Sequence, residues 1–217
     1  MQNLNTFIDH TLLKPEATKS QIVQLCKEAK TYNMKAVCVN PHFIATAAGE
    51  LFGSETKVCT VIGFPLGTNQ TETKVFETEK AIEAGADEID MVLNIGELID
   101  NNLEFVKSDI EAVLKMTHKH DKLLKVIFET SKLSNDQIVS ACKICKELKV
   151  DFVKTSTGFG GGGATLEHVK LMRDTVGSEI GVKASGGVRD TETAIKMIEA
   201  GATRIGTSSS LIILGQQ

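Results

Sequence analysis

The stretch Glu83-Ala84-Gly85-Ala86-Asp87-Glu88-Ile89 recurs in closely similar form as Glu199-Ala200-Gly201-Ala202-Thr203-Arg204-Ile205. In each copy a helical pattern ends at a glycine, the residue that most readily adopts the left-handed conformation just beyond a helix. A short apolar run with an isoleucine follows, which indicates a strand. The chain therefore contains an internal repeat in which a helix leads into a strand.

The same alternation of short apolar runs and longer amphipathic stretches continues along the whole chain. Thr18 and Ser134 each precede a glutamine at capping-box spacing and open two of the helical patterns. Strands are predicted over residues 6–13, 35–40, 57–63, 88–94, 123–129, 151–156, 180–185 and 203–207. Eight strands that alternate with helices predict an α/β fold, a (β/α)8 TIM barrel at the compact end of its size range. An open doubly wound sheet is the alternative.

The 217 residues show no linker, low-complexity tract or shift in composition, so one domain spanning residues 1–217 is expected. After the last predicted strand, Leu211-Ile212-Ile213-Leu214 leaves room for only a shortened C-terminal helix before Gln217.

Bulk properties narrow the possible partners and location. The net charge of −4 argues against nucleic acid and anionic membrane surfaces as partners. No stretch approaches 18 consecutive apolar residues, and the N-terminal MQNLNTFIDHTLL lacks the layout of a secretion signal. Five scattered cysteines, an odd number, are typical of a reducing cytosol. A cytoplasmic protein is predicted.

Two matched hexapeptides carry the main chemical signal. VKTSTG at residues 153–158 and VKASGG at residues 182–187 each place a lysine inside a predicted strand, where a buried ammonium ion is unfavourable. The two strands would be neighbours in a barrel, and the matched motifs give Lys154 and Lys183 the same orientation and similar height. Both lysines are therefore expected at the C-terminal end of the barrel, where catalytic groups of this fold lie.

Proximity of two lysines favours amine chemistry. A neighbouring cation and partial burial both lower a lysine pKa. At its ordinary pKa of about 10.4 a lysine is only about 0.04% neutral at pH 7, and a pKa of roughly 7 raises that fraction about a thousandfold. The neutral amine attacks a carbonyl to form a Schiff base. Charge alone does not decide which of the two lysines is the nucleophile. The alternative is that each lysine faces the surface or is paired with a carboxylate.

Asp90 interrupts the strand pattern of residues 88–94 with a carboxylate. If it faces the barrel axis, it balances the lysine charge and moves protons; a structural ion pair is the alternative. Asp9 and His10 are likewise polar residues within a predicted strand, the first. Lys125 and Glu129 in the fifth strand are further candidate site residues, ranked after the two lysines and Asp90.

Glycine-rich segments after the last three strands predict a phosphate site. Backbone N–H groups in such loops bind anions, and the loops after strands 7 and 8 commonly do so in this fold. The candidate phosphate-binding residues are Gly158, Gly186, Gly187, Gly206, Ser208 and Ser209. Cys142 and Cys145 have metal-ligand spacing but lie on an apolar helix face, which favours the core, and the histidines form no ligand cluster.

Longer motifs connect these features to a known family. They are DHTLLKP at residues 9–15, VCVNP at 37–41, VIGFPLG at 61–67, DEIDMV at 87–92 and the two lysine hexapeptides. With these motifs the sequence resembles the deoxyribose-phosphate aldolases, a family of class I aldolases, over nearly its whole length.

The resemblance implies a TIM barrel that cleaves 2-deoxy-D-ribose 5-phosphate reversibly into D-glyceraldehyde 3-phosphate and acetaldehyde. By motif match, it makes Lys154 the Schiff-base nucleophile and Lys183 and Asp90 the proton donors and acceptors. It also implies a phosphorylated small-molecule substrate, no metal or organic cofactor, a cytoplasmic location and a homodimer or homotetramer. Two alternatives remain open: a phosphosugar isomerase or synthase that uses lysine only as an acid or clamp, and a non-catalytic phosphosugar-binding protein.

Overall fold

Parallel strands form a closed barrel in chain order, and the last strand pairs with the first. The computed structural model describes residues 3–216, so Met1, Gln2 and Gln217 of the expected domain lie outside the described residues. The strands are β1 (Ile8–Leu12), β2 (Ala36–Val39), β3 (Lys57–Ile62), β4 (Glu88–Val92), β5 (Leu123–Ile127), β6 (Phe152–Lys154), β7 (Gly181–Ser185) and β8 (Arg204–Thr207). The predicted TIM barrel is confirmed, and the open sheet is excluded.

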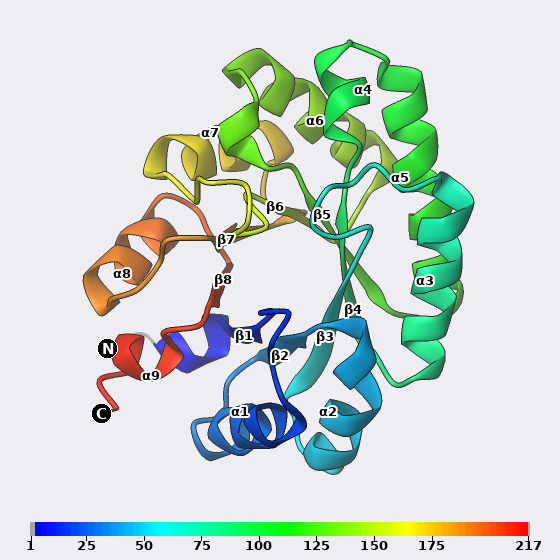
Figure 1. The fold of residues 1–217 in the computed structure, drawn as a ribbon. Coiled ribbons are helices and arrows are strands. Elements are labelled where there is room, and N and C mark those ends of the chain that lie inside the picture. Colours follow the sequence, from blue (N-terminus) through cyan, green and yellow to red (C-terminus); the bar gives the residue numbers. More distant parts are fainter. Residues whose placement is uncertain (1–2, 217) are drawn as a thin grey trace.

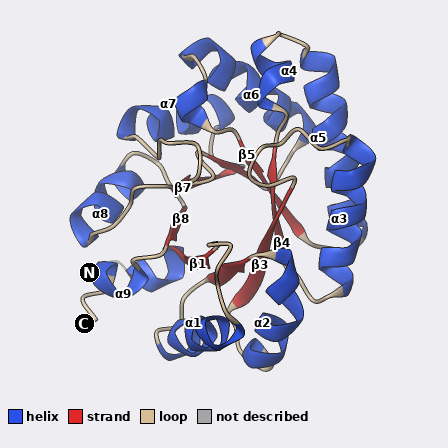
Figure 2. Ribbon diagram, in the orientation of Figure 1, coloured by secondary structure: helices blue, strands red, loops and turns tan. Residues whose placement is uncertain are grey.

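The helices form a layer around the strands, as Figures 1 and 2 show in a view roughly along the barrel axis. They are α1 (Lys19–Thr31), α2 (Ile44–Leu51), α3 (Thr71–Glu83), α4 (Ile95–Ile99), α5 (Leu103–Lys119), α6 (Asn135–Leu148), α7 (Leu166–Val176), α8 (Thr191–Glu199) and α9 (Ser210–Ile213). The four-residue α9 confirms the shortened last helix. Within residues 3–216, the helices are all too short or too polar to cross a membrane.

Local sequence signals set several element boundaries. Thr18 and Ser134 both form complete capping boxes, at the starts of α1 and α6. Gly85 and Gly201 follow α3 and α8 with φ of 108° and 112°. A Cβ at Gly201 would lie 2.6 Å from Cγ of Arg173, so both backbone angle and space require glycine there.

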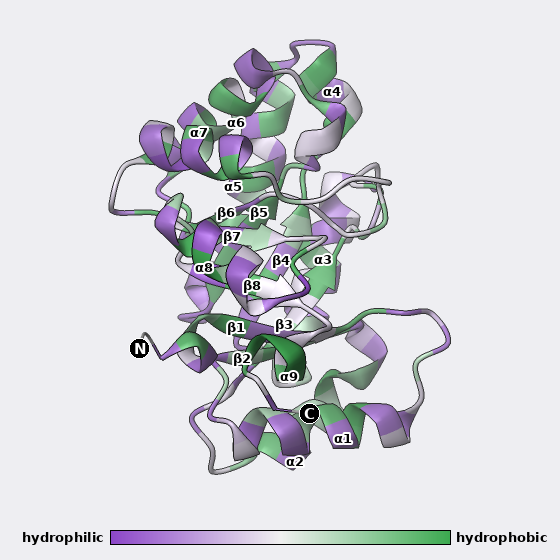
Figure 3. Cartoon of the chain, turned by 90° about the vertical axis from the view of Figure 1, so that its left-hand side faces the viewer, coloured by the Kyte–Doolittle hydropathy of each residue, from purple (hydrophilic) through white to green (hydrophobic). Residues whose placement is uncertain are grey.

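The apolar core lies between the barrel and the helices. Cys142 and Cys145 belong to it, and burial raises the pKa of the Cys142 thiol to about 12. Figure 3 shows hydrophilic and hydrophobic residues alternating along outer helices such as α1 and α8, as amphipathic packing requires. The inside of the barrel differs, because charged side chains fill much of it.

Candidate active site

Six charged side chains inside the barrel form a closed ring of ion pairs, here called the charge ring. In order around the ring they are Arg204, Glu88, Lys125, Asp90, Lys183 and Asp9, and each is buried. Cations and anions alternate, so that every member contacts at least two groups of opposite charge, and Lys125 Nζ also lies 4.0 Å from Oδ2 of Asp9 across the ring. Three positive and three negative charges leave the ring neutral.

Short distances close the ring at every step. Arg204 bridges two carboxylates, with Nη1 2.5 Å from Oδ1 of Asp9 and Nη2 2.9 Å from Oε1 of Glu88. Lys125 Nζ lies 2.6 Å from Oε2 of Glu88 and 2.8 Å from Oδ1 of Asp90. Lys183 Nζ lies 2.8 Å from Oδ2 of Asp90 and 2.5 Å from Oδ2 of Asp9.

Lys154 contacts the ring but is not a member of it. Its Nζ lies 2.7 Å from Oδ2 of Asp90, the same oxygen that Lys183 contacts. The structure thus brings Lys154, Lys183 and Asp90 together at one carboxylate oxygen. With Lys154 protonated, four cations face three carboxylates, and the cluster carries one excess positive charge.

Neighbouring charges dominate the ionisation of the ring. Burial alone would raise the pKa of Asp90, but the ammonium groups of Lys125, Lys154 and Lys183 hold it well below its usual range. Burial likewise opposes the ionisation of Asp9, yet Arg204 and the lysines lower its pKa. In the opposite sense, Asp9 and Asp90 raise the pKa of Lys183 despite its burial. Asp9, Asp90 and Lys183 therefore stay ionised at neutral pH.

These shifts predict that the fold loses stability in acid. Asp9 and Asp90 have lower pKa values in the folded protein than the 3.9 or so of an unfolded aspartate, so their stabilisation is present above that value. It is lost progressively as the pH falls below about 5. Urea unfolding followed by circular dichroism from pH 7 to pH 3 should show a falling free energy of unfolding. A free energy that stays constant between pH 5 and pH 3 would contradict the ionised ring.

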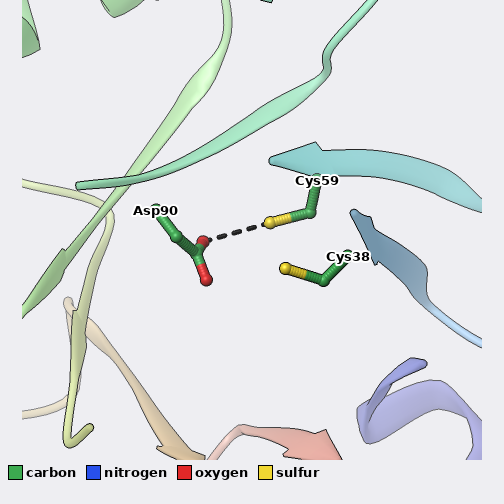
Figure 4. A group of neighbouring side chains, drawn as sticks. All are labelled: Cys38, Cys59 and Asp90. Carbon is green, nitrogen blue, oxygen red and sulfur yellow. Dashed lines mark hydrogen bonds between the residues drawn. The ribbon is translucent and has the colours of Figure 1, made fainter. Parts of the chain in front are cut away.

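Two cysteines lie beside the ring, on adjacent strands β2 and β3. Figure 4 shows Cys38 and Cys59 facing Asp90, and Cys59 Sγ lies 3.1 Å from Oδ1 of Asp90. These three side chains have metal-ligand chemistry and lie close enough together for it. However, Lys125 Nζ already lies 3.3 Å from Cys59 Sγ and 2.8 Å from Asp90 Oδ1, so an ammonium group occupies the place of a cation. The surrounding positive charges also disfavour a metal ion.

A pocket of about 240 Å³ opens at the C-terminal ends of β6, β7 and β8. Of the residues expected at the site, it is lined by Lys154, Gly158, Gly186, Gly187, Gly206 and Ser208. Asp90 and Lys183 are fully buried; Asp90 contacts Lys154 at the pocket wall, and Lys183 contacts the same oxygen of Asp90.

Two of the expected phosphate residues, Gly206 and Ser209, are placed differently from the other four. Gly206 lies within β8, not in the loop after it, and a Cβ there would lie 3.0 Å from Cε of Lys183. Its missing side chain makes room for that lysine. Ser209 does not line the pocket, and its N–H donates to Oγ1 of Thr207 at 2.9 Å.

The glycine loop after β6 packs tightly onto Glu129. The carboxylate of Glu129 accepts hydrogen bonds from the backbone N–H and the hydroxyl of Thr157. A Cβ at Gly160 would lie 2.5 Å from Cδ of Glu129, so only glycine allows this approach. At the pocket mouth Phe159 stacks edge-to-face on Phe64, with ring centroids 5.4 Å apart. Glu129 thus holds the loop that forms one wall of the pocket.

Sequence reasoning missed Glu88, Arg204, Cys38 and Cys59 as site residues. A signal existed for the first two, because Glu88 and Arg204 occupy equivalent positions of the internal repeat with opposite charges. Glu88 also lies two residues before Asp90 and therefore shares its face of β4. The cysteines gave no signal, since buried cysteines ordinarily belong to a core.

Comparison with known proteins identifies the family. The DeoC/LacD family of aldolases matches residues 4–214. The chain belongs to that family. Deoxyribose-phosphate aldolase 1 of Oceanobacillus iheyensis is 57% identical over 216 residues, which cover 99% of this chain and 97% of that protein. A deoxyribose-phosphate aldolase of Clostridium tetani is 56% identical and covers 97% of both chains. The resemblance inferred from the sequence motifs is confirmed.

Solved structures of the same family share the fold closely. A putative deoxyribose-phosphate aldolase from Coccidioides immitis superposes with a TM-score of 0.95 at 44% identity, covering 98% of this chain and 85% of that one. The enzyme from Aeropyrum pernix, described as having a unique tetrameric structure, gives 0.91 at 32% identity and covers 98% and 89%.

Proposed function

We propose that this protein is a class I aldolase that cleaves 2-deoxy-D-ribose 5-phosphate reversibly into D-glyceraldehyde 3-phosphate and acetaldehyde. The observation that carries the proposal is the position of Lys154, at the wall of the pocket and attached to a neutral charge ring. Membership of the DeoC/LacD aldolases and the names of the close relatives support the reaction and the substrate.

Lys154 is the proposed nucleophile. Release of one proton from the cluster removes its excess positive charge, and Lys154 is the lysine of the cluster that lines the pocket. Its neutral amine attacks C1 of the open-chain sugar and forms a carbinolamine. Loss of water then gives a protonated imine, which accepts electrons from the neighbouring carbon–carbon bond.

Bond cleavage follows from the imine. The C2–C3 electron pair moves toward the imine nitrogen and leaves an enamine, while the C3 hydroxyl loses its proton and becomes the aldehyde of glyceraldehyde 3-phosphate. Protonation of the enamine at C2 and hydrolysis of the imine release acetaldehyde and restore the amine. Asp90 and Lys183 are the proposed proton donors and acceptors, because Oδ2 of Asp90 contacts Nζ of both Lys154 and Lys183.

The reaction itself tests this function. The purified protein, given 2-deoxy-D-ribose 5-phosphate and EDTA, is expected to form glyceraldehyde 3-phosphate and acetaldehyde in equal amounts. Formation of an isomeric phosphosugar without cleavage would favour the isomerase alternative. Binding with no turnover would favour a phosphosugar-binding protein.

The substrate phosphate is proposed to bind in the loops after β7 and β8, chiefly at Gly187 and Ser208. Both residues line the pocket, as do the cationic Lys14 and Arg189. Gly187 has a φ of 82°, and an added Cβ would meet nothing within 4 Å, so its side of the pocket is open. Backbone N–H groups in such an open glycine turn are available to an anion.

A bulky residue at this glycine should weaken phosphate binding selectively. Gly187→Val is expected to raise KM for deoxyribose 5-phosphate roughly ten- to hundredfold, because lost hydrogen bonds to a charged group are worth about 1–3 kcal/mol. KM for unphosphorylated deoxyribose should change much less. Gly177→Val is the matched control, because Gly177 has a similar φ of 80° but lies beyond α7 and does not line the pocket. Equal losses on both sugars would place the phosphate elsewhere.

We further propose that the chain acts as one domain, in a cytoplasmic homodimer or homotetramer. The tetramer described for the Aeropyrum pernix relative supports an oligomer. Large apolar side chains on the surface, including Phe52, Leu66 and Phe76, offer contact area for a second copy. The cysteines are all free and buried, which suits a reducing compartment.

A further inference from the structure

Glu88 and Arg204 belong to the charge ring but have no part in the proposed chemistry. Neither lines the pocket, and each is nearly completely buried, with 1% and 2% of its surface exposed. They contact each other directly, with Arg204 Nη2 2.9 Å from Glu88 Oε1. Burying two charged groups carries a large desolvation free energy, and these two take no part in the reaction, which points to another role.

Their contacts orient the groups that surround Lys154. Arg204 holds Oδ1 of Asp9, which leaves Oδ2 of Asp9 to bind Lys183. Glu88 holds Lys125, and Lys125 in turn takes Oδ1 of Asp90. Oδ2 of Asp90 is therefore left for Lys154 and Lys183 together.

Their charges also balance the ring. Lys125, Lys183 and Arg204 oppose Asp9, Glu88 and Asp90 one for one. Loss of Arg204 would leave the ring with one negative charge, which favours a protonated Lys154. Loss of Glu88 would leave one positive charge, which favours the neutral amine. In a buried cluster such a charge acts over several ångströms with little screening.

We propose that Glu88 and Arg204 are positioning residues that hold the charge ring neutral and so set the pH at which Lys154 forms its imine. This inference rests on the proposed function of Lys154. The titratable or charged groups near Lys154 or at its pocket come from the other seven strands and from three loops. The strand residues are Asp9, Cys38, Cys59, Glu88, Asp90, Lys125, Lys183 and Arg204, and the loop residues are Lys14, Glu129 and Arg189. Among the described ion pairs, Glu88 and Arg204 are the two ring members that contact none of Lys154, Lys183 and Asp90. Their removal therefore alters the ring charge without removing a contact of these three residues.

The test is the pH midpoint of adduct formation with acetaldehyde and sodium cyanoborohydride, followed by intact-protein mass. Arg204→Met is expected to move the midpoint upward and Glu88→Gln downward, each by about one pH unit. The double variant Glu88→Gln/Arg204→Met keeps a neutral ring of two lysines and two aspartates. Its midpoint should return to the wild-type value, with a lower rate because Asp9 and Lys125 are held less firmly.

A matched control separates this electrostatic effect from general loss of stability. Lys74 and Asp109 form another buried ion pair, between α3 and α5, with Nζ 2.6 Å from Oδ2. Lys74→Met/Asp109→Asn should lower the melting temperature without moving the midpoint. If one single ring variant fails to fold, the direction of the shift in the other carries the test. The double variant, which leaves no unpaired charge, then checks that restoring a neutral ring abolishes that shift.

The outcomes distinguish this inference from the proposed function. Midpoints that shift in the same direction in the two single variants, or that do not shift, would overturn the inference. A midpoint of the folded double variant displaced by about one unit or more would do the same. A wild-type protein that forms no acetaldehyde adduct would overturn the proposed function. A wild-type protein that forms the adduct, with variants whose pH midpoints do not shift, would overturn the inference alone and leave the proposed function intact.

Discussion

Lys154→Ala is expected to abolish aldol cleavage, with turnover reduced by at least about 10⁴-fold, the scale seen when a covalent nucleophile is removed. The physical reason is that Lys154 is the lysine of the cluster that lines the pocket, whereas Lys14, also in the lining, makes no ion pair with the cluster among the described residues. Coupled assay of glyceraldehyde 3-phosphate measures the loss. Retention of more than a few per cent of wild-type turnover would contradict the assignment.

The same variant should fold. Lys154 contacts the cluster only through Asp90 among the described ion pairs, and the charge ring stays neutral without it. The melting temperature should therefore equal or exceed that of the wild type. Lys122→Ala is a suitable control, because it also removes one lysine–carboxylate contact, the 3.1 Å pair with Asp87, and neither residue lines the pocket. That control should keep full activity.

Asp90→Asn is expected to lower both stability and turnover. The change removes the one carboxylate that contacts three lysines and leaves a buried cluster with two excess positive charges. Breaking a buried ion pair from one side costs about 3–5 kcal/mol. For a protein of this size that lowers the melting temperature by roughly 6–20 °C. Thermal unfolding followed by circular dichroism checks this shift.

Turnover should fall about 10²- to 10⁴-fold, measured well below the melting temperature, if Asp90 also transfers protons. Asp9→Asn is the comparison that separates the two roles. It removes a carboxylate from the same ring, but Asp9 contacts Lys183 and Arg204 and makes no ion pair with Lys154 among the described residues. It should lose similar stability but less turnover. Near-normal turnover in folded Asp90→Asn would reduce Asp90 to a structural ion pair.

The fold was predictable because its signals are local. The capping boxes at Thr18 and Ser134, the glycines at 85 and 201 and the apolar runs all act within a few residues. Predicted strands ran up to two residues too long at their C-terminal ends; β6, for example, ends at Lys154 where residues up to 156 were expected. Thr155 still donates its N–H to the carbonyl of Lys183, so pairing continues while the chain turns into the loop.

The charge ring was not predictable to the same extent, because barrel closure creates it. Asp9 and Arg204 are far apart in the sequence and meet because β1 pairs with β8. The matched lysine motifs did indicate that Lys154 and Lys183 are neighbours, and the register places them directly opposite each other on β6 and β7. The shared carboxylate oxygen between them depends on side-chain geometry that spacing does not encode.

The left-handed backbone of Glu129 is a further feature without a sequence signal. Its φ of 58° is uncommon for a non-glycine residue, and the conformation is held by the bonds of its carboxylate to Thr157. A helical or strand pattern gives no indication of such a turn. This turn places the Glu129 carboxylate against Gly160 in the loop after β6, which forms one wall of the pocket. The contact exists only once the loops after β5 and β6 pack together.

The most direct test of Lys154 as the nucleophile is to trap the protein with acetaldehyde and borohydride and map the modified peptide by mass spectrometry. Reduction converts a protein-bound imine into a stable ethyl group on one lysine nitrogen. The proposed function predicts one ethyl group per chain, on Lys154. An adduct on Lys183, or protection of every lysine of the cluster from modification, would contradict it.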